Sequence, residues 1–189
     1  MSEPQEHPRV PIPESYWVVP GRLLAGGYPG SLHEREARHK LRAFLEAGIR
    51  LFIDLTEEDE LVHYDEWLAQ EAAAKGIDVE YRRVPVRDFG IPTRQGVRDV
   101  FHLVDSAVRD ERPAYIHCWG GIGRTGTMIG CWLRRDGCDL DTAIERLATL
   151  RRRTPEAWRQ SPETDEQRRF ISAWTDDTCD DEASRGADE

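Results

Sequence analysis

The stretch that most constrains this chain is residues 114–127, which read AYIHCWGGIGRTGT. A short apolar run ends in His117-Cys118, a glycine-rich turn follows, and a segment of helical character begins near Arg124. Glycines let a turn point its N–H groups inward and leave room for a ligand. A helix N-terminus adds partial positive charge at the same place. We therefore predict a site for phosphate or another tetrahedral anion, with Cys118 and Arg124 both addressing the ligand.

The predicted site suits nucleophilic catalysis by a thiol. A free thiol is only about a few per cent thiolate at neutral pH. Inward N–H groups, a helix N-terminus and a guanidinium all stabilise the thiolate. The planar fork of Arg124 can also bind two phosphoryl oxygens at once. Cys118 is therefore a candidate nucleophile placed beneath a bound phosphate.

Three other interpretations compete for the same stretch. Residues 121–126 match the dinucleotide fingerprint G-x-G-x-x-G, which requires a later strand with an acidic residue, whereas the following sequence looks helical as far as Trp174. A Walker-type phosphate loop needs Lys before its Ser or Thr, and this stretch has none. A buried structural cysteine beside a tight turn is a common arrangement, but it does not explain Arg124 or the glycines. We favour the anion site.

The pattern His117-Cys118-(five residues)-Arg124-Thr125-Gly126 resembles the signature H-C-x-x-G-x-G-R-T-G of the cysteine-dependent protein tyrosine and dual-specificity phosphatases. The resemblance covers about residues 16–174. It implies an α/β fold in which a phosphate-binding loop joins the last strand to a helix. No counterpart of the tyrosine-recognition loop of the large tyrosine phosphatases is visible, which favours the smaller dual-specificity type.

The resemblance also implies roles for individual residues. Cys118 and Arg124 are expected to be catalytic, and the Thr125 hydroxyl to stabilise the departing thiolate. His117 and Gly126 are expected to support the loop. The residues expected to bind the substrate phosphate, together with Arg124, are Trp119, Gly120, Gly121, Ile122 and Gly123. For the Trp119 side chain, a pocket wall and outward packing are equally consistent with the sequence.

Phosphoryl transfer to a thiolate needs an acid for the leaving oxygen, and the same group can then act as a base on water. Residues 86–92, VRDFGIP, are similar to the mobile acid loop of tyrosine phosphatases, in which Pro-Asp-Phe-Gly-Val-Pro is common. Asp88 is therefore the expected general acid, although an Asp in a turn is a simpler interpretation. The next carboxylates to consider are Asp54, Glu57 and Glu58.

Residues 159–167 resemble the segment in which tyrosine phosphatases place a water-orienting Gln. Glu163 stands at that position here. A carboxylate near a transferred phosphate would repel it, so we expect Glu163 to turn away. A helix start at Ser161 and Pro162 also accounts for this segment.

The chain of 189 residues is long enough for one domain with a substantial core. We expect tails at residues 1–14 and 175–189 around a catalytic domain at 15–174. A net charge of −10 argues against nucleic-acid or anionic-membrane binding. Four cysteines without metal-ligand spacing predict a reducing, cytoplasmic setting. We expect a monomer that needs neither metal nor cofactor.

Strand-like and helix-like segments alternate before a helical end. This order predicts an α/β fold with a central, largely parallel sheet flanked by helices. The expected strands are residues 23–25, 50–55, 79–86 and 113–117. The expected helices are residues 31–47, 67–75, 93–108, 125–136, 139–152 and 162–174.

These observations favour a phosphatase that acts on phosphotyrosine, and also on phosphoserine or phosphothreonine, in a protein or peptide. A second hypothesis applies the same chemistry to a small phosphorylated molecule or an inositol phosphate. A third is a catalytically silent phosphate-binding module, against which the presence of Cys118, Arg124 and Asp88 counts.

Overall fold

The computed structural model describes residues 8–175 and contains one five-stranded sheet in the order β1-β2-β5-β3-β4. β1 runs antiparallel to β2, and all the other neighbouring strands are parallel. The α/β fold class with a largely parallel sheet is thus confirmed. The strands are β1 (Ser15–Val19), β2 (Leu23–Gly26), β3 (Leu51–Asp54), β4 (Glu80–Arg83) and β5 (Ala114–His117).

All six expected helices are present, with ends that differ by a few residues. Local sequence signals explain several of these ends. The helix that begins at Arg94 is preceded by Thr93, whose side chain accepts a hydrogen bond from the Gly96 amide and acts as the N-cap. Gly48 and Gly76 follow helix ends with φ of +87° and +64°, values that glycine adopts readily. The helices are α1 (Glu34–Glu46), α2 (Asp65–Ala74), α3 (Arg94–Arg109), α4 (Arg124–Arg134), α5 (Leu140–Arg151) and α6 (Asp165–Ser172).

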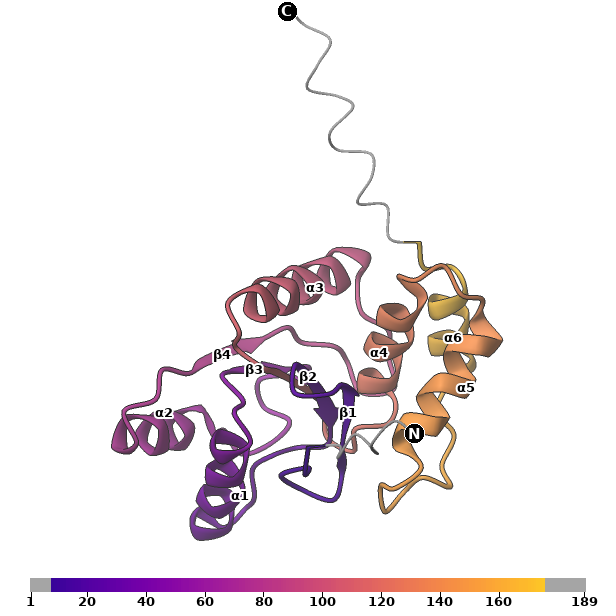
Figure 1. Cartoon of the computed structure of the whole chain (residues 1–189). Helices are drawn as coiled ribbons and strands as arrows, with labels where there is room; N and C mark the ends of the chain where they lie inside the picture. Colours follow the sequence, from indigo (N-terminus) through magenta and orange to yellow (C-terminus); the bar gives the residue numbers. More distant parts are fainter. Residues whose placement is uncertain (1–7, 176–189) are drawn as a thin grey trace, which may run out of the picture.

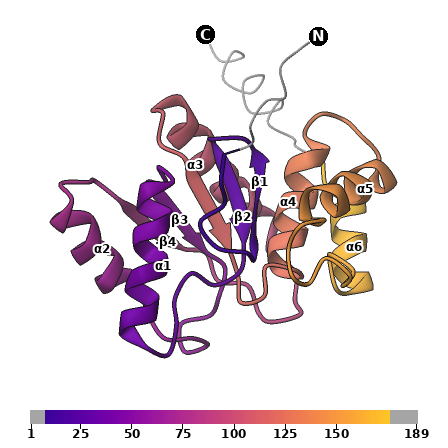
Figure 2. The same ribbon diagram turned by 60° about the horizontal axis from the view of Figure 1, so that its bottom comes forward.

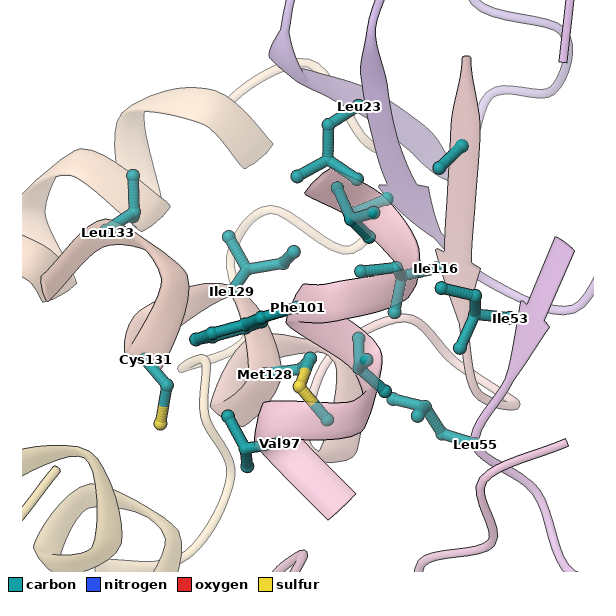
Figure 3. Packing of buried hydrophobic residues seen from close by; sticks show 14 of the residues in the cluster. Leu23, Ile53, Leu55, Val97, Phe101, Ile116, Met128, Ile129, Cys131 and Leu133 are labelled. Atoms are coloured by element: carbon teal, nitrogen blue, oxygen red, sulfur yellow. The ribbon is translucent and has the colours of Figure 1, made fainter. Parts of the chain in front are cut away.

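Helices cover both faces of the sheet (Figures 1 and 2). α1 and α2 pack on one face, where Phe44, Phe52 and Tyr115 belong to the smaller buried cluster. The larger cluster lies on the other face, beneath α3, α4, α5 and α6. Figure 3 shows part of it, in which Phe101 of α3 and Ile129 of α4 lie close to Ile116 of the central strand. Strand β5 is therefore buried from both sides, and its end fixes the start of the glycine-rich turn.

Two strands differ from expectation. β1 was not predicted, because its residues give no clear alternation and it joins the sheet at the edge through an antiparallel pairing with a register shift near Trp17. β4 is shorter than the predicted 79–86. Beyond Arg83 the chain still forms backbone hydrogen bonds at Val84 and Val86, to Asp54 and Leu55.

The expected tails lie largely outside the described residues. Within the described part, Ile12 is buried in the smaller cluster and its carbonyl accepts a hydrogen bond from Ser15. Packing therefore begins before β1. No helix in residues 8–175 combines the length and the apolar character needed to span a membrane.

Candidate active site

Cys118 follows the last residue of β5 and is buried at the base of the glycine-rich turn, residues 119–123, called here the P-loop. α4 begins directly after the P-loop, so its N-terminus faces the same region. The Thr125 hydroxyl donates a hydrogen bond to the Cys118 sulfur across 3.0 Å. Gly121 has φ of +70°, and a side-chain carbon there would lie 2.4 Å from the backbone of Gly26. Only glycine fits this turn without displacing β2.

Hydrogen bonds from three directions hold the outer side of the P-loop. The Ser161 hydroxyl donates to the carbonyl of Ile122 (2.7 Å), and the Thr127 hydroxyl donates to that of Gly123 (2.9 Å). The amide of Tyr28, just beyond β2, donates to the carbonyl of Trp119 (2.8 Å). Carbonyls that are held on the outer side leave the loop amides free to face an anion.

Arg124 is almost completely buried and forms a bidentate ion pair with Glu60, with both N–O distances at 2.6 Å. Its Nη1 atom also donates to the carbonyl of Val86 (3.1 Å). Burial lowers the pKa of Arg124, but the Glu60 hydrogen bonds and nearby negative charges outweigh it and raise the pKa overall. Burial raises the pKa of Glu60, and the bond from Arg124 reverses this, so its pKa lies below the ordinary value. Glu60 therefore fixes the direction of the Arg124 guanidinium.

Asp88 contacts the same guanidinium, at the Nη2 atom that Glu60 also binds. Its Oδ1 atom is 3.1 Å from Nη2 of Arg124, and its side chain is about two-fifths exposed at 42%. The loop around it, residues 86–92, is called here the acid loop. The loop therefore brings a carboxylate to Arg124 from a position 30 residues before Cys118.

His117 is fully buried and hydrogen-bonded at both ring nitrogens. Nδ1 lies 3.2 Å from the Cys118 carbonyl, and Nε2 lies 2.6 Å from the Tyr64 hydroxyl. Because a carbonyl can only accept, Nδ1 carries the proton and Nε2 accepts from Tyr64. Burial lowers the pKa of His117 despite the nearby Asp54 carboxylate, which favours the neutral ring. His117 fixes the backbone at Cys118 rather than supplying a proton.

The other predicted carboxylates have different partners. Asp54 is buried and accepts hydrogen bonds from the Thr56 backbone and hydroxyl and from the Tyr81 hydroxyl. Glu58 pairs with Arg83 at 2.5 Å. Glu57 is exposed. The structure thus brings only Asp88, among the four candidates for the acid, to Arg124.

We expected Glu163 to turn away from a bound phosphate, and this stays a prediction. A side-chain carbon at Gly123 would lie 2.4 Å from the Glu163 Oε2 atom, so the carboxylate stays against the P-loop. An ion pair with Arg159 offsets its charge. The Trp119 side chain is exposed at 63%, so it does not pack into the core. Residues 118–175 contain no strand, which excludes the dinucleotide interpretation.

Sequence reasoning missed Glu60 and Gln167. Glu60 stands in an acidic stretch, TEEDE, in which a loop or a helix cap is the ordinary interpretation. Its distance of 64 positions from Arg124 left no local signal for the ion pair. Gln167 ends the segment 159–167 that resembles a phosphatase motif, but its bond to the acid loop depends on tertiary structure.

The arrangement can carry out phosphoryl transfer. A buried thiol lies at the base of a glycine-rich loop, a hydroxyl donates to its sulfur, and the guanidinium of the helix that follows the loop pairs with a carboxylate. Amides and a guanidinium match the charge of a phosphate, while the carboxylate can hold or give a proton.

A family model described as "Polymorphic toxin system, DSP-PTPase phosphatase" matches residues 28–138. An uncharacterized protein of Methanocaldococcus jannaschii is 33% identical over 88 residues, which are 47% of this chain and 50% of that protein. The mouse protein tyrosine phosphatase domain-containing protein 1 is 26% identical over 126 residues, 63% of this chain and 16% of that protein. The chain thus spans half or less of the length of these curated relatives.

Solved structures share the fold over most of both chains. Tk-PTP in the active form is 26% identical with a TM-score of 0.62, covering 84% of this chain and 94% of that chain. The PP-IP phosphatase SIW14 core domain from S. cerevisiae is 18% identical with a TM-score of 0.63, covering 90% and 91%. At 18% identity, the similarity to the SIW14 domain shows a shared fold alone. The matched segment of the family model contains the acid loop, Cys118 and the whole P-loop.

Proposed function

Because the chain belongs to the DSP-PTPase phosphatases of polymorphic toxin systems, within the cysteine-based tyrosine and dual-specificity phosphatase superfamily, we propose that it hydrolyses phosphomonoesters on proteins through a phosphocysteine intermediate. The proposed substrates are phosphotyrosine and also phosphoserine or phosphothreonine. The observation that carries the proposal is the meeting of the Cys118 sulfur, the Thr125 hydroxyl, Arg124 and Asp88 around the P-loop.

The proposed first step transfers the phosphoryl group to sulfur. The Cys118 thiolate attacks phosphorus and forms an S–P bond, while the ester P–O bond breaks and Asp88 gives its proton to the leaving oxygen. The P-loop amides and Arg124 stabilise the charge on the other phosphoryl oxygens. Arg124 changes partners in this step, because it binds Asp88 when no phosphate is present.

In the proposed second step, water attacks the phosphocysteine. The Asp88 carboxylate takes a proton from the water, a P–O bond forms and the S–P bond breaks. Phosphate and the Cys118 thiolate result, and the Thr125 hydroxyl stabilises the thiolate through the bond already present at 3.0 Å. Electrons and protons balance with water as the only co-reactant.

Charges near the site favour a protein substrate over a polyanionic inositol phosphate. The segment Trp119–Gly123 carries no charged side chain. Of the three arginines that could provide a basic rim, Arg83 and Arg82 pair with Glu58 and Glu80, and Arg87 is exposed beside Asp88. Two exposed aromatic side chains, Trp119 and Phe89, adjoin Cys118 and Asp88 in the sequence and offer apolar surface to a peptide.

The proposal is tested with the full chain in EDTA on four substrates: a phosphotyrosyl peptide, a phosphoseryl peptide, an inositol hexakisphosphate and an aryl phosphate. We expect turnover of the phosphotyrosyl peptide and the aryl phosphate, and little with the inositol phosphate. Cys118→Ser should abolish turnover and retain tungstate binding, because the P-loop and Arg124 remain. Turnover by Cys118→Ser similar to wild type would refute the mechanism. A clear preference for the inositol phosphate would refute the protein substrate.

A further inference from the structure

Gln167 lies in the first turn of α6 and is completely buried. Its side-chain Oε1 atom accepts hydrogen bonds from the backbone amides of Thr164 and Glu163, and its backbone amide donates to the Thr164 hydroxyl. This reciprocal pattern is a capping box, and it uses the carbonyl end of the Gln167 side chain. A Glu at this position would form the same cap, so capping alone does not require an amide.

The amide nitrogen of Gln167 has a different partner. Nε2 donates to the carbonyl of Gly90 in the acid loop, across 2.9 Å and 77 positions of sequence. The same side chain also adjoins the P-loop, because a side-chain carbon at Gly123 would lie 3.2 Å from Nε2. Gln167 therefore stands where α6, the P-loop and the acid loop meet.

The acid loop has few other attachments beyond Val86. Arg124 contacts it at the Val86 carbonyl and at Asp88, and a turn bond joins Gly90 to Arg87 within the loop itself. Phe89, between Asp88 and Gly90, is 58% exposed. A phosphate bound by Arg124 competes for the donors that hold Asp88. The bond from Gln167 is independent of that competition.

We propose that Gln167 is a positioning residue that holds the acid loop, and with it Asp88, over the P-loop while Arg124 binds phosphate. The catalytic part of this inference rests on the proposed role of Asp88 as the general acid. The positional part rests only on the bond to Gly90 and the packing against Gly123.

The test compares Gln167→Glu with Thr164→Ala. Gln167→Glu keeps the acceptor for the capping box but replaces the donor to Gly90 with a carboxylate oxygen. Thr164→Ala removes the hydroxyl of the cap and keeps the donor. Loss of the cap lowers Tm by roughly 2–4 °C. Loss of a neutral hydrogen bond that holds one loop position shifts the population of that position about tenfold.

Hydrogen exchange of a peptide covering residues 86–92 reports the loop without reference to catalysis. We expect exchange there to accelerate about tenfold in Gln167→Glu and to stay unchanged in Thr164→Ala. In Gln167→Glu, kcat for phosphotyrosine should fall about tenfold, while kcat for an aryl ester with a good leaving group changes little.

The possible outcomes separate the two parts of the inference. Faster loop exchange with equal loss on both esters would support the positional role and reject Asp88 as the acid. Unchanged loop exchange in Gln167→Glu would overturn the positioning role. Equal acceleration in Gln167→Glu and Thr164→Ala would also overturn it, because Gln167 would then act only as a helix cap.

Discussion

Glu60→Gln should weaken both the fold and the catalytic site. The wild-type carboxylate accepts two charge-assisted bonds of 2.6 Å from Arg124, which is almost completely buried. A Gln side chain keeps one acceptor oxygen and turns an N–H group toward the guanidinium. Arg124 then retains Asp88 and the Val86 carbonyl as partners.

The size of the effect follows from these contacts. Charge-assisted hydrogen bonds contribute about 1.5–3 kcal/mol and neutral ones about 1 kcal/mol, so the variant should lose about 2 kcal/mol of the free energy of unfolding. Stripping a buried charge of its partner costs about 3–5 kcal/mol, and the remaining partners of Arg124 keep the loss below that range. For a domain of this size the loss corresponds to a Tm lower by roughly 4–8 °C.

Catalysis should also slow in Glu60→Gln, because the Arg124 guanidinium loses the partner that fixes its direction. A shift of a positioning group by about 1 Å can cost about 10²-fold in rate. We expect kcat/KM of Glu60→Gln on an aryl phosphate to fall about 10- to 100-fold. The exposed neighbour Glu57, on the same loop, provides the matched control, and Glu57→Gln should leave both Tm and kcat/KM close to wild type.

The stability difference should depend on pH in a defined direction. The pKa of Glu60 in the folded protein lies below its ordinary value of 4.5. Its contribution is therefore complete above that value and is lost as pH falls through the lower pKa of the folded state. Denaturant titrations of wild type and Glu60→Gln should differ most at neutral pH and converge in acid. A difference that is the same at pH 7 and in acid would refute the ion-pair explanation.

Two further predictions concern the acid loop and the P-loop. Asp88→Asn should lower kcat on phosphotyrosine about 10²–10⁴-fold, which is the usual contribution of a placed general acid. The loss should be much smaller on an aryl ester with a good leaving group. Equal losses on both substrates would point to a structural defect. Gly121→Ala should abolish tungstate binding, because its side-chain carbon would lie 2.4 Å from Gly26, whereas Gly76→Ala, with a similar φ of +64° and open space around it, should bind tungstate like wild type. Tungstate binding by Gly121→Ala equal to wild type would show that the P-loop tolerates another backbone path.

Local patterns predicted most of the fold. The alternation of apolar runs with helical periodicity identified four of the five strands and all six helices, since each depends on residues close together in the sequence. β1 was missed because its pairing with β2 decides its conformation. The order of the strands was not predicted, because the parallel contact of β2 with β5 joins segments separated by about half of the chain.

The candidate site likewise contains residues that could be predicted from the local sequence and residues that could not. Cys118, the P-loop, Arg124 and Thr125 stand in one contiguous stretch, so their proximity could be predicted from spacing. Asp88 was found through the residues of its own loop. The partners that orient these groups, Glu60 for Arg124 and Tyr64 for His117, lie 64 and 53 positions away from them. Only the folded structure brings them together.

The C-terminal end of β2, which lies against the P-loop, has a consequence for folding. Gly121 of the P-loop packs directly against the backbone of Gly26, and the carbonyl of Gly27 accepts a bond from the Tyr115 hydroxyl, so the P-loop rests on backbone made early in synthesis. Contacts between such distant segments form only after a large loop of chain has closed, which slows folding. Before β5 pairs with β2, the anion site is incomplete, even if the helices have already formed. During refolding, enzymatic turnover therefore reports only molecules in which β5 has paired with β2. Its recovery should lag behind the recovery of the far-ultraviolet circular dichroism signal, which reports helix and strand content.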